Sequence, residues 1–223
     1  MGYFLQELNS KAKITNKGVP GYGLFQMYSS LKYDVIAGKK PLIAIFNYAT
    51  FHDGRTPLVN AYSRDVTSVL HPNLEKNKKS YLKYLDFNEK KNIIKSIKIT
   101  ELPKHFMFRH YSALINLINT RIDENQYSKI QSKLNRISYL TVIEIKKFCE
   151  KNNIKLIFVG LDKDSKNLLN KLKIEGVHVV YFPIDISKPS NNCAPIDPFH
   201  PNAKVHKHYA DLISMELKKI KLI

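Results

Sequence analysis

The stretch Asn152–Leu161, NNIKLIFVGL, decides the fold class. Two asparagines, which favour the end of a preceding helix, stand first, and a short apolar run follows them. Such a run is typical of a strand that is buried on both faces of a parallel sheet. The preceding residues, about 127–151, carry apolar side chains at helical spacing, with Leu134, Ile137 and Ile143 in the buried stripe. A helix that leads into a doubly buried strand favours an α/β protein.

The sequence after this strand continues the alternation. Residues 162–176, DKDSKNLLNKLKIEG, predict a helix that Asp164 or Ser165 caps and Gly176 ends. Residues 177–185, VHVVYFPID, predict the next strand, and a closing helix follows with Pro201 near its first turn. Strands separated by helices indicate parallel pairing through right-handed crossovers.

The first half of the chain has the same pattern in weaker form. Residues 2–11 predict a short helix, 24–40 a helix that ends at Gly38, and 41–49 a strand. We predict a single three-layer α/β/α domain over 1–223, with a mainly parallel sheet and a cap-like insertion at about 65–125. Within it, RHYSALINLINTR (109–121) has an apolar helix face that we interpret as core or lid packing.

The charge balance is strongly basic, with 36 Lys+Arg against 19 Asp+Glu and a formal net charge of +17. An excess of this size is compatible with a polyanionic partner. The five arginines are few for a reader of bases or phosphates, which disfavours nucleic acid. Lysines interleaved with Tyr81, Tyr84 and Phe87 have the spacing of a base-stacking surface, but a solvated basic cap is the simpler interpretation.

Several other classes of protein receive no support. No apolar run reaches the length of a membrane span, and no signal peptide is visible, so the compartment stays open. Cys149 and Cys193 lack C-x-x-C spacing, which argues against a zinc or redox pair. His206 and His208 lie two residues apart in the closing helix and face different sides. We therefore expect neither a metal nor a cofactor, and the oligomeric state is undetermined.

The stretch Asp197–His208, DPFHPNAKVHKH, lies between the last strand and the closing helix. Ligands of open α/β sheets bind at the carboxyl ends of strands, where this loop would lie. An Asp three residues before a His can accept its Nδ1–H and leave Nε2 as a general base. The alternative is an Asp that caps the helix beside an ordinary loop histidine.

The motif D-x-x-H-P-N-x-x-x-H-x-x-Y-A at 197–210 resembles the C-terminal block of the SGNH (GDSL-type) hydrolases. Residues 16–31, NKGVPGYGLFQMYSSL, resemble the second block of that family. Residues 43–56, IAIFNYATFHDGRT, fall where the family has its third block. The resemblance covers most of the chain outside 65–125 and implies a flavodoxin-like sandwich that hydrolyses or transfers ester acyl groups, with O-acylated carbohydrate as one substrate class.

The resemblance also implies roles for five residues. His200 would be the general base and Asp197 its orienter, while the Gly21 N–H would help to form the oxyanion hole. The family's third block normally supplies an Asn donor, and here His52 and Arg55 are the stand-ins. The alternatives are a simple turn at Gly21 and a surface loop with a salt bridge at 52–55.

One part of the family pattern is missing. No Gly-Asp-Ser block occurs, and residues 1–15 read as a helix end and the start of a second strand, so the first strand and its nucleophilic Ser are absent. Ser10 precedes the second block but lies at the wrong end of the sheet to meet His200. Either the chain is a fragment of an esterase, inactive as written, or it is a nucleophile-free module that binds an anionic glycan or another polyanion.

Overall fold

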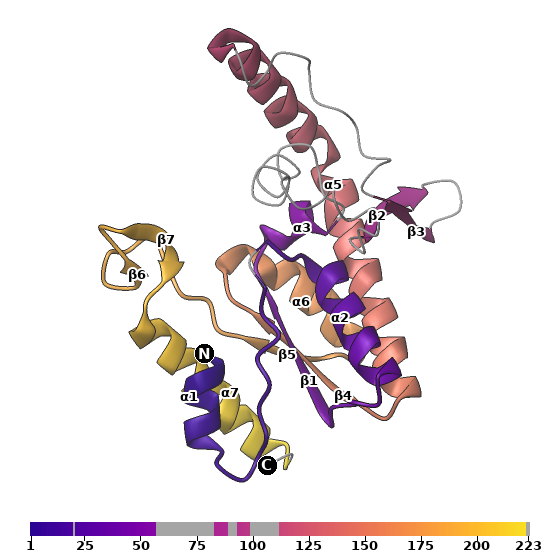
Figure 1. The fold of residues 1–223 in the computed structure, drawn as a ribbon, viewed down its shortest axis with the longest axis vertical. Helices are drawn as coiled ribbons and strands as arrows, with labels where there is room; N and C mark the ends of the chain where they lie inside the picture. Colours follow the sequence, from indigo (N-terminus) through magenta and orange to yellow (C-terminus); the bar gives the residue numbers. More distant parts are fainter. Residues whose placement is uncertain (20, 57–82, 89–92, 99–111, 222–223) are drawn as a thin grey trace. The chain divides into compact units, whose positions relative to one another are not determined.

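A computed structural model describes residues 1–19, 21–56, 83–88, 93–98 and 112–221 (Figure 1). The chain divides into two compact units, each built from separate stretches. The first unit comprises Met1–Gly18, Pro41–Thr50 and Asn153–Ile223, and the second comprises Val19–Lys40 and Phe51–Asn152. The predicted single domain with an insertion at 65–125 stays a prediction, because most of that insertion lies outside the described residues.

The first unit contains a three-stranded parallel sheet in the order β1–β4–β5. β1 is Ile43–Tyr48, β4 is Lys155–Gly160 and β5 is His178–Tyr181. All three strands lie where the sequence predicts them. The mixed helix and strand content confirms an α/β fold, with the central β4 formed by the apolar run of NNIKLIFVGL.

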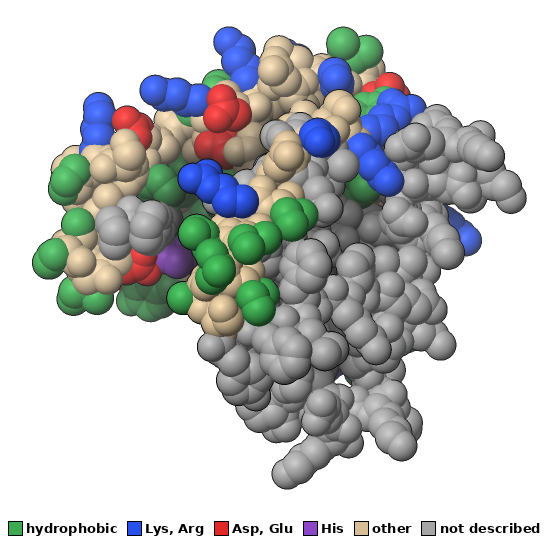
Figure 2. Space-filling view, turned by 90° about the horizontal axis from the view of Figure 1, so that it is seen from above, with side chains coloured by type: hydrophobic (Ala, Val, Ile, Leu, Met, Phe, Trp, Pro, Cys, Tyr) green, Lys and Arg blue, Asp and Glu red, His purple; other side chains and the backbone are tan. Residues whose placement is uncertain are grey.

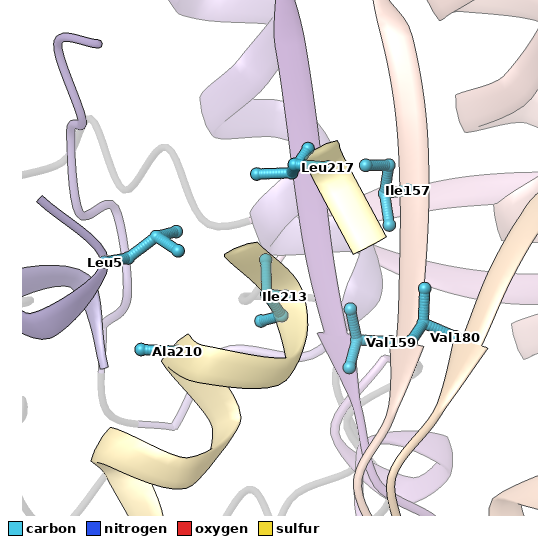
Figure 3. Packing of buried hydrophobic residues seen from close by; sticks show 7 residues of the cluster. All are labelled: Leu5, Ile157, Val159, Val180, Ala210, Ile213 and Leu217. Atoms are coloured by element: carbon cyan, nitrogen blue, oxygen red, sulfur yellow. The ribbon is translucent and has the colours of Figure 1, made fainter. Parts of the chain in front are cut away.

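Helices cover both faces of this sheet. On one face, α7 (Ala203–Lys219) and α1 (Gly2–Leu8) pack against it. Figure 3 shows the buried apolar cluster between these two helices and the strands, which consists of Leu5, Ile157, Val159, Val180, Ala210, Ile213 and Leu217. Alternate residues of β4 point to the other face, where Gly160 lies against Leu169 of α6 (Lys166–Ile174).

A carboxylate joins the ends of β1 and β4. The Oδ2 atom of Asp162 accepts hydrogen bonds from the N–H of Thr50 at 2.6 Å and from its hydroxyl at 2.8 Å. The Oδ1 atom accepts from the Ser165 N–H at 2.8 Å and so caps the short 3-10 helix Lys163–Ser165. Of the two predicted caps of α6, Ser165 is its N-cap residue, although its side chain makes no capping hydrogen bond, and Asp164 is not. Gly176 follows the C-cap of α6 with φ of 76°, in agreement with the predicted end of this helix.

The second unit contains α2 (Leu24–Ile36), α3 (His52–Arg55), a β2–β3 hairpin and α5. β2 (Lys83–Asn88) and β3 (Ile93–Lys98) pair antiparallel. α5 runs unbroken from Ala113 to Lys151, where the sequence suggested two helical segments. Tyr28 of α2 and Phe148 of α5 meet edge to face, with ring centroids 5.5 Å apart.

Two local predictions are wrong. Residues 11–18 form no strand, so the expected start of a second strand is absent from this segment. The core interpretation of the apolar face at 109–121 is wrong, because Leu114 is 66% exposed and Ile118 is 49% exposed. The lid interpretation stays a prediction, and Tyr111 lies outside the described residues. Helical spacing predicts which side chains share a face but carries no information on whether anything packs against it.

Candidate active site

The Asp–His pair lies on a small antiparallel hairpin that follows β5 along the chain (Figure 1). β6 is Asn192–Cys193 and β7 is Asp197–Pro201. His200 Nδ1 and Asp197 Oδ2 are 2.6 Å apart, a distance typical of a charge-assisted hydrogen bond. The His200 side chain is 73% exposed, which leaves its other ring nitrogen accessible from solvent. The predicted base and orienter are therefore in contact.

Asparagine side chains hold this hairpin in shape. Asn202 Nδ2 donates to the carbonyls of Ser190 at 2.9 Å and Asn192 at 3.2 Å. Its Oδ1 accepts from the Val205 N–H at 3.1 Å and caps α7. The buried Asn192 donates to the Ile186 carbonyl at 2.9 Å and accepts from the Ala194 N–H at 2.9 Å. Asn202 thus connects the loop that carries His200 to the start of α7, and Asn192 holds the loop itself together.

His206, in the first two turns of α7, is partly buried and lies near other positive groups. Burial lowers the pKa of His206 from its ordinary value of 6.5, and the charges of the Met1 amine and His200 lower it further. Burial also lowers the pKa of the Met1 amine itself. His206 therefore lies close enough to His200 and to the Met1 amine, within the first unit, for their positive charges to lower its pKa.

Gly21, His52 and Arg55 lie in the second unit. Gly21 has φ of 83°, a conformation that favours glycine, and it precedes the start of α2. The Leu24 N–H donates to the Thr56 hydroxyl at 3.0 Å, and that hydroxyl donates to the His52 carbonyl at 2.8 Å. These bonds connect the loop after Gly21 to α3. Two of the predicted blocks therefore meet within this unit.

The surface-loop alternative for residues 52–55 is wrong. His52 is 5% exposed and its neighbour Asp53 is 2% exposed, where the Ser138 hydroxyl donates to Asp53 Oδ1 at 2.5 Å. The Arg55 guanidinium lies 4.2 Å from the centroid of the Phe51 ring. Their proposed roles as oxyanion donors stay predictions, since the two units are described separately and His200 belongs to the other one.

No candidate nucleophile among the described residues is bonded to His200. Among them, His200 hydrogen-bonds with Asp197 and with no hydroxyl or thiol group. Ser10 adjoins Asn9, whose Oδ1 accepts from Ser214. Ser214 is about 16 Å along the axis of α7 from Ala203, at which end His200 lies. The structure thus agrees with the sequence that Ser10 cannot serve His200.

Cys193 and the two asparagines were not recognised from the sequence as parts of this site. Cys193 pairs across the hairpin with Asp197, and its thiol lies 3.6 Å from the Pro201 carbonyl oxygen. A usable signal was the density of Asn and Pro in SKPSNNCAPIDP, because asparagines that bond to nearby backbone are typical of ordered loops.

Within the described ranges, no group of three or more His, Cys, Asp or Glu side chains is placed to hold a metal ion. None of the helices described is long and apolar enough to cross a membrane. No family model, curated protein or solved structure matches the chain. The assignment of function therefore depends on the site and on the motif resemblance.

Proposed function

We propose that this chain is an SGNH-type ester hydrolase module that supplies the general base and its orienting carboxylate. The observation that carries the proposal is the 2.6 Å contact between His200 Nδ1 and Asp197 Oδ2. Such a contact keeps the proton on Nδ1 and leaves Nε2 to accept a proton from an attacking hydroxyl. By resemblance, the substrate would be an ester, with O-acylated carbohydrate as one candidate class.

The residues would act in sequence around a serine hydroxyl. His200 Nε2 takes the proton as the serine oxygen attacks the ester carbonyl carbon, and His200 then returns it to the leaving alcohol. Asp197 stabilises the imidazolium that forms between these steps. The Gly21 N–H, with His52 or Arg55, would donate to the oxyanion. Because no described hydroxyl meets His200, we expect the 223-residue polypeptide to be inactive.

The hydrogen-bond geometry can be tested without activity. Long-range ¹H–¹⁵N NMR of the imidazole should show the neutral Nδ1–H tautomer of His200 in the wild type. Asp197→Asn should weaken that preference, whereas Asp185→Asn, in the same loop region, should leave it unchanged. A neutral Nε2–H tautomer in the wild type would contradict the role of Asp197 as orienter.

Hydrolysis of an aryl acetate tests the expected inactivity. We expect the wild type, His200→Ala and Cys193→Ala to be indistinguishable from buffer. Turnover that disappears in His200→Ala but persists in Cys193→Ala would show a hydroxyl nucleophile within this chain. Turnover that requires both residues would identify Cys193 as the nucleophile, and either result would overturn the expectation.

The coding DNA immediately upstream of codon 1 tests the origin of the nucleophile. An in-frame apolar strand that ends in Gly-Asp-Ser would supply the missing first block and support the esterase proposal. A stop codon and ribosome-binding site directly before Met1 would favour the second candidate, a non-catalytic module that binds an anionic glycan.

The lysine distribution favours that second candidate over other binding functions. The nine residues of α6 include Lys166, Lys171 and Lys173 and no acidic residue. Figure 2 shows Lys and Arg side chains spread over the visible face of the described residues, with acidic groups beside some of them. Binding of a sulfated glycan that weakens steeply between low and physiological salt would support this function. Weak binding already at low salt would exclude it.

A further inference from the structure

The turn of the β6–β7 hairpin is an exposed apolar segment of the first unit. Cys193, Ala194, Pro195 and Ile196 follow one another in the chain, and all four are exposed. Ile196 is 94% exposed, which is unusual for so large an apolar side chain. Figure 1 shows the hairpin standing off the three-stranded sheet, between β5 and the start of α7. We call these four residues the hairpin tip.

The backbone of the hairpin tip is suited to an apolar surrounding. The Ala194 N–H donates to Asn192 Oδ1 at 2.9 Å, and the Ile196 N–H donates to the Cys193 carbonyl at 3.1 Å. Pro195 has no N–H. A segment that leaves water needs its backbone donors satisfied internally, because lipid hydrocarbon offers no replacement for the lost hydrogen bonds. From Ala194 to Ile196, such a transfer leaves no backbone N–H unpaired.

The charges on both sides of the hairpin tip are mainly positive. Residues 186–210 contain three lysines and three histidines against one carboxylate, Asp197. Lys188 precedes the hairpin and Lys204 follows it in the first turn of α7, and both are exposed. The formal net charge of the whole chain, +17, has the same sign. An uncharged tip between lysines matches an anionic lipid surface, where apolar side chains enter the interface and lysines stay with the headgroups.

We propose that the hairpin tip is a docking site for an anionic membrane surface. Cys193–Ile196 enter the headgroup region, while Lys188 and Lys204 remain beside the lipid phosphates. The apolar turn, its paired N–H groups and the net charge of +17 together favour lipid over a protein partner. Docking does not depend on the proposed hydrolase function, although it would hold His200, which lies on the same hairpin, near the membrane.

A second exposed apolar side chain of the first unit, Ile174, lacks this setting. It is 85% exposed, but it stands between Lys173 and Glu175 at the end of α6. This position precedes the amino end of β5, whereas the hairpin follows the carboxyl end of the same strand. Ile174 and Lys173 are therefore matched controls for Ile196 and Lys204.

Sedimentation with lipid vesicles tests the docking site. We expect the chain to bind vesicles of phosphatidylcholine and phosphatidylglycerol in equal parts and to stay in solution with phosphatidylcholine alone. Ile196→Ser should weaken binding by roughly 10-fold, because it removes the largest apolar side chain of the tip. Ile174→Ser should leave binding unchanged. Absence of binding to the anionic vesicles at low salt overturns the proposal, and so does equal binding of the wild type and Ile196→Ser.

Two charge variants test the contribution of the flanking lysines. Lys204→Glu should weaken binding to the anionic vesicles by roughly 10- to 30-fold, since it reverses a charge beside the lipid phosphates. Lys173→Glu makes the same change at the amino end of β5 and should have little effect. An equal loss in both variants would contradict the proposal, because the overall charge of the chain would then account for binding.

A fluorophore on Cys193 shows whether the tip itself enters the interface. Cys149 is buried, so an environment-sensitive thiol reagent added to the folded chain should label Cys193. We expect its emission to shift to the blue when anionic vesicles are added. The same fluorophore on Ile174→Cys, in a chain with Cys193→Ser, should not shift. Unchanged emission from labelled Cys193 in the vesicle-bound chain would overturn the proposal, because another face would then contact the lipid.

Discussion

Gly160, the last residue of β4, should tolerate no side chain. A Cβ built on it would lie 2.4 Å from Leu169 Cδ1 and 2.6 Å from Ser165 Oγ. Neither neighbour can move freely, since Leu169 is 2% exposed and Ser165 is fully buried with its hydroxyl bonded to the Asp162 carbonyl at 2.7 Å. Gly160→Ala should therefore lower the free energy of unfolding by about 1–3 kcal/mol, the usual cost of overpacking a core.

Urea unfolding followed by circular dichroism measures this loss, and a double-mutant cycle identifies its cause. Leu169→Ala alone should cost about 2–5 kcal/mol because it leaves a cavity. Combined with Gly160→Ala it should cost less than the sum of the two, since the new methyl group occupies the space that Leu169 vacates. Gly176→Ala is the control, because its added Cβ meets nothing within 4 Å although φ is 76°.

Additive effects of Gly160→Ala and Leu169→Ala would refute the reasoning. They would mean that α6 does not lie against the end of β4 as described. Non-additive effects of Leu169→Ala and the control Gly176→Ala would also refute it, because the strain at Gly176 arises from backbone conformation and not from packing.

Three further predictions concern single side chains. Asn202→Ala should destabilise the chain by about 2–3 kcal/mol in urea unfolding through loss of the α7 cap and two hairpin bonds, whereas Asn202→Asp retains the cap and should cost less. The folded state lowers the pKa of His206 from 6.5, so the unfolded chain binds more protons and thermal stability should fall as pH drops through 6.5; His206→Gln should show a shallower fall. Burial raises the pKa of Cys149 to about 11, so at pH 8 an aromatic disulfide reagent should label the exposed Cys193 promptly and Cys149 only in urea; equal labelling rates in the folded protein would contradict the buried placement.

The strands of the first unit could be predicted from sequence because their signal is local. KLIFVG is apolar on both faces, and only a doubly covered strand accommodates it. The Asp–His contact could also be predicted, since three residues of separation bring the two side chains within reach.

The remaining features depend on long-range packing that the sequence does not encode locally. Asp162 bonds to Thr50 across 112 residues, and no pattern near either residue indicates the other. The exposure of Leu114 and Ile118 likewise depends on what lies opposite their helix face. The burial of His52 and Asp53 also depends on a distant contact, the hydrogen bond between Ser138 and Asp53. Without that contact, their polar sequence indicates a surface loop.

The division of the first unit into three separated stretches has a consequence for synthesis on the ribosome. β1 emerges early, but its partner β4 begins at Lys155 and the helix that covers their shared face ends at Lys219. The apolar residues of β1 can therefore be buried only after β4 and α7 have been synthesised. The second unit is complete earlier, once Asn152 has emerged. Nascent chains that stall between these points would expose an unpaired apolar strand, so chaperone dependence should be greatest for the N-terminal two thirds of the protein.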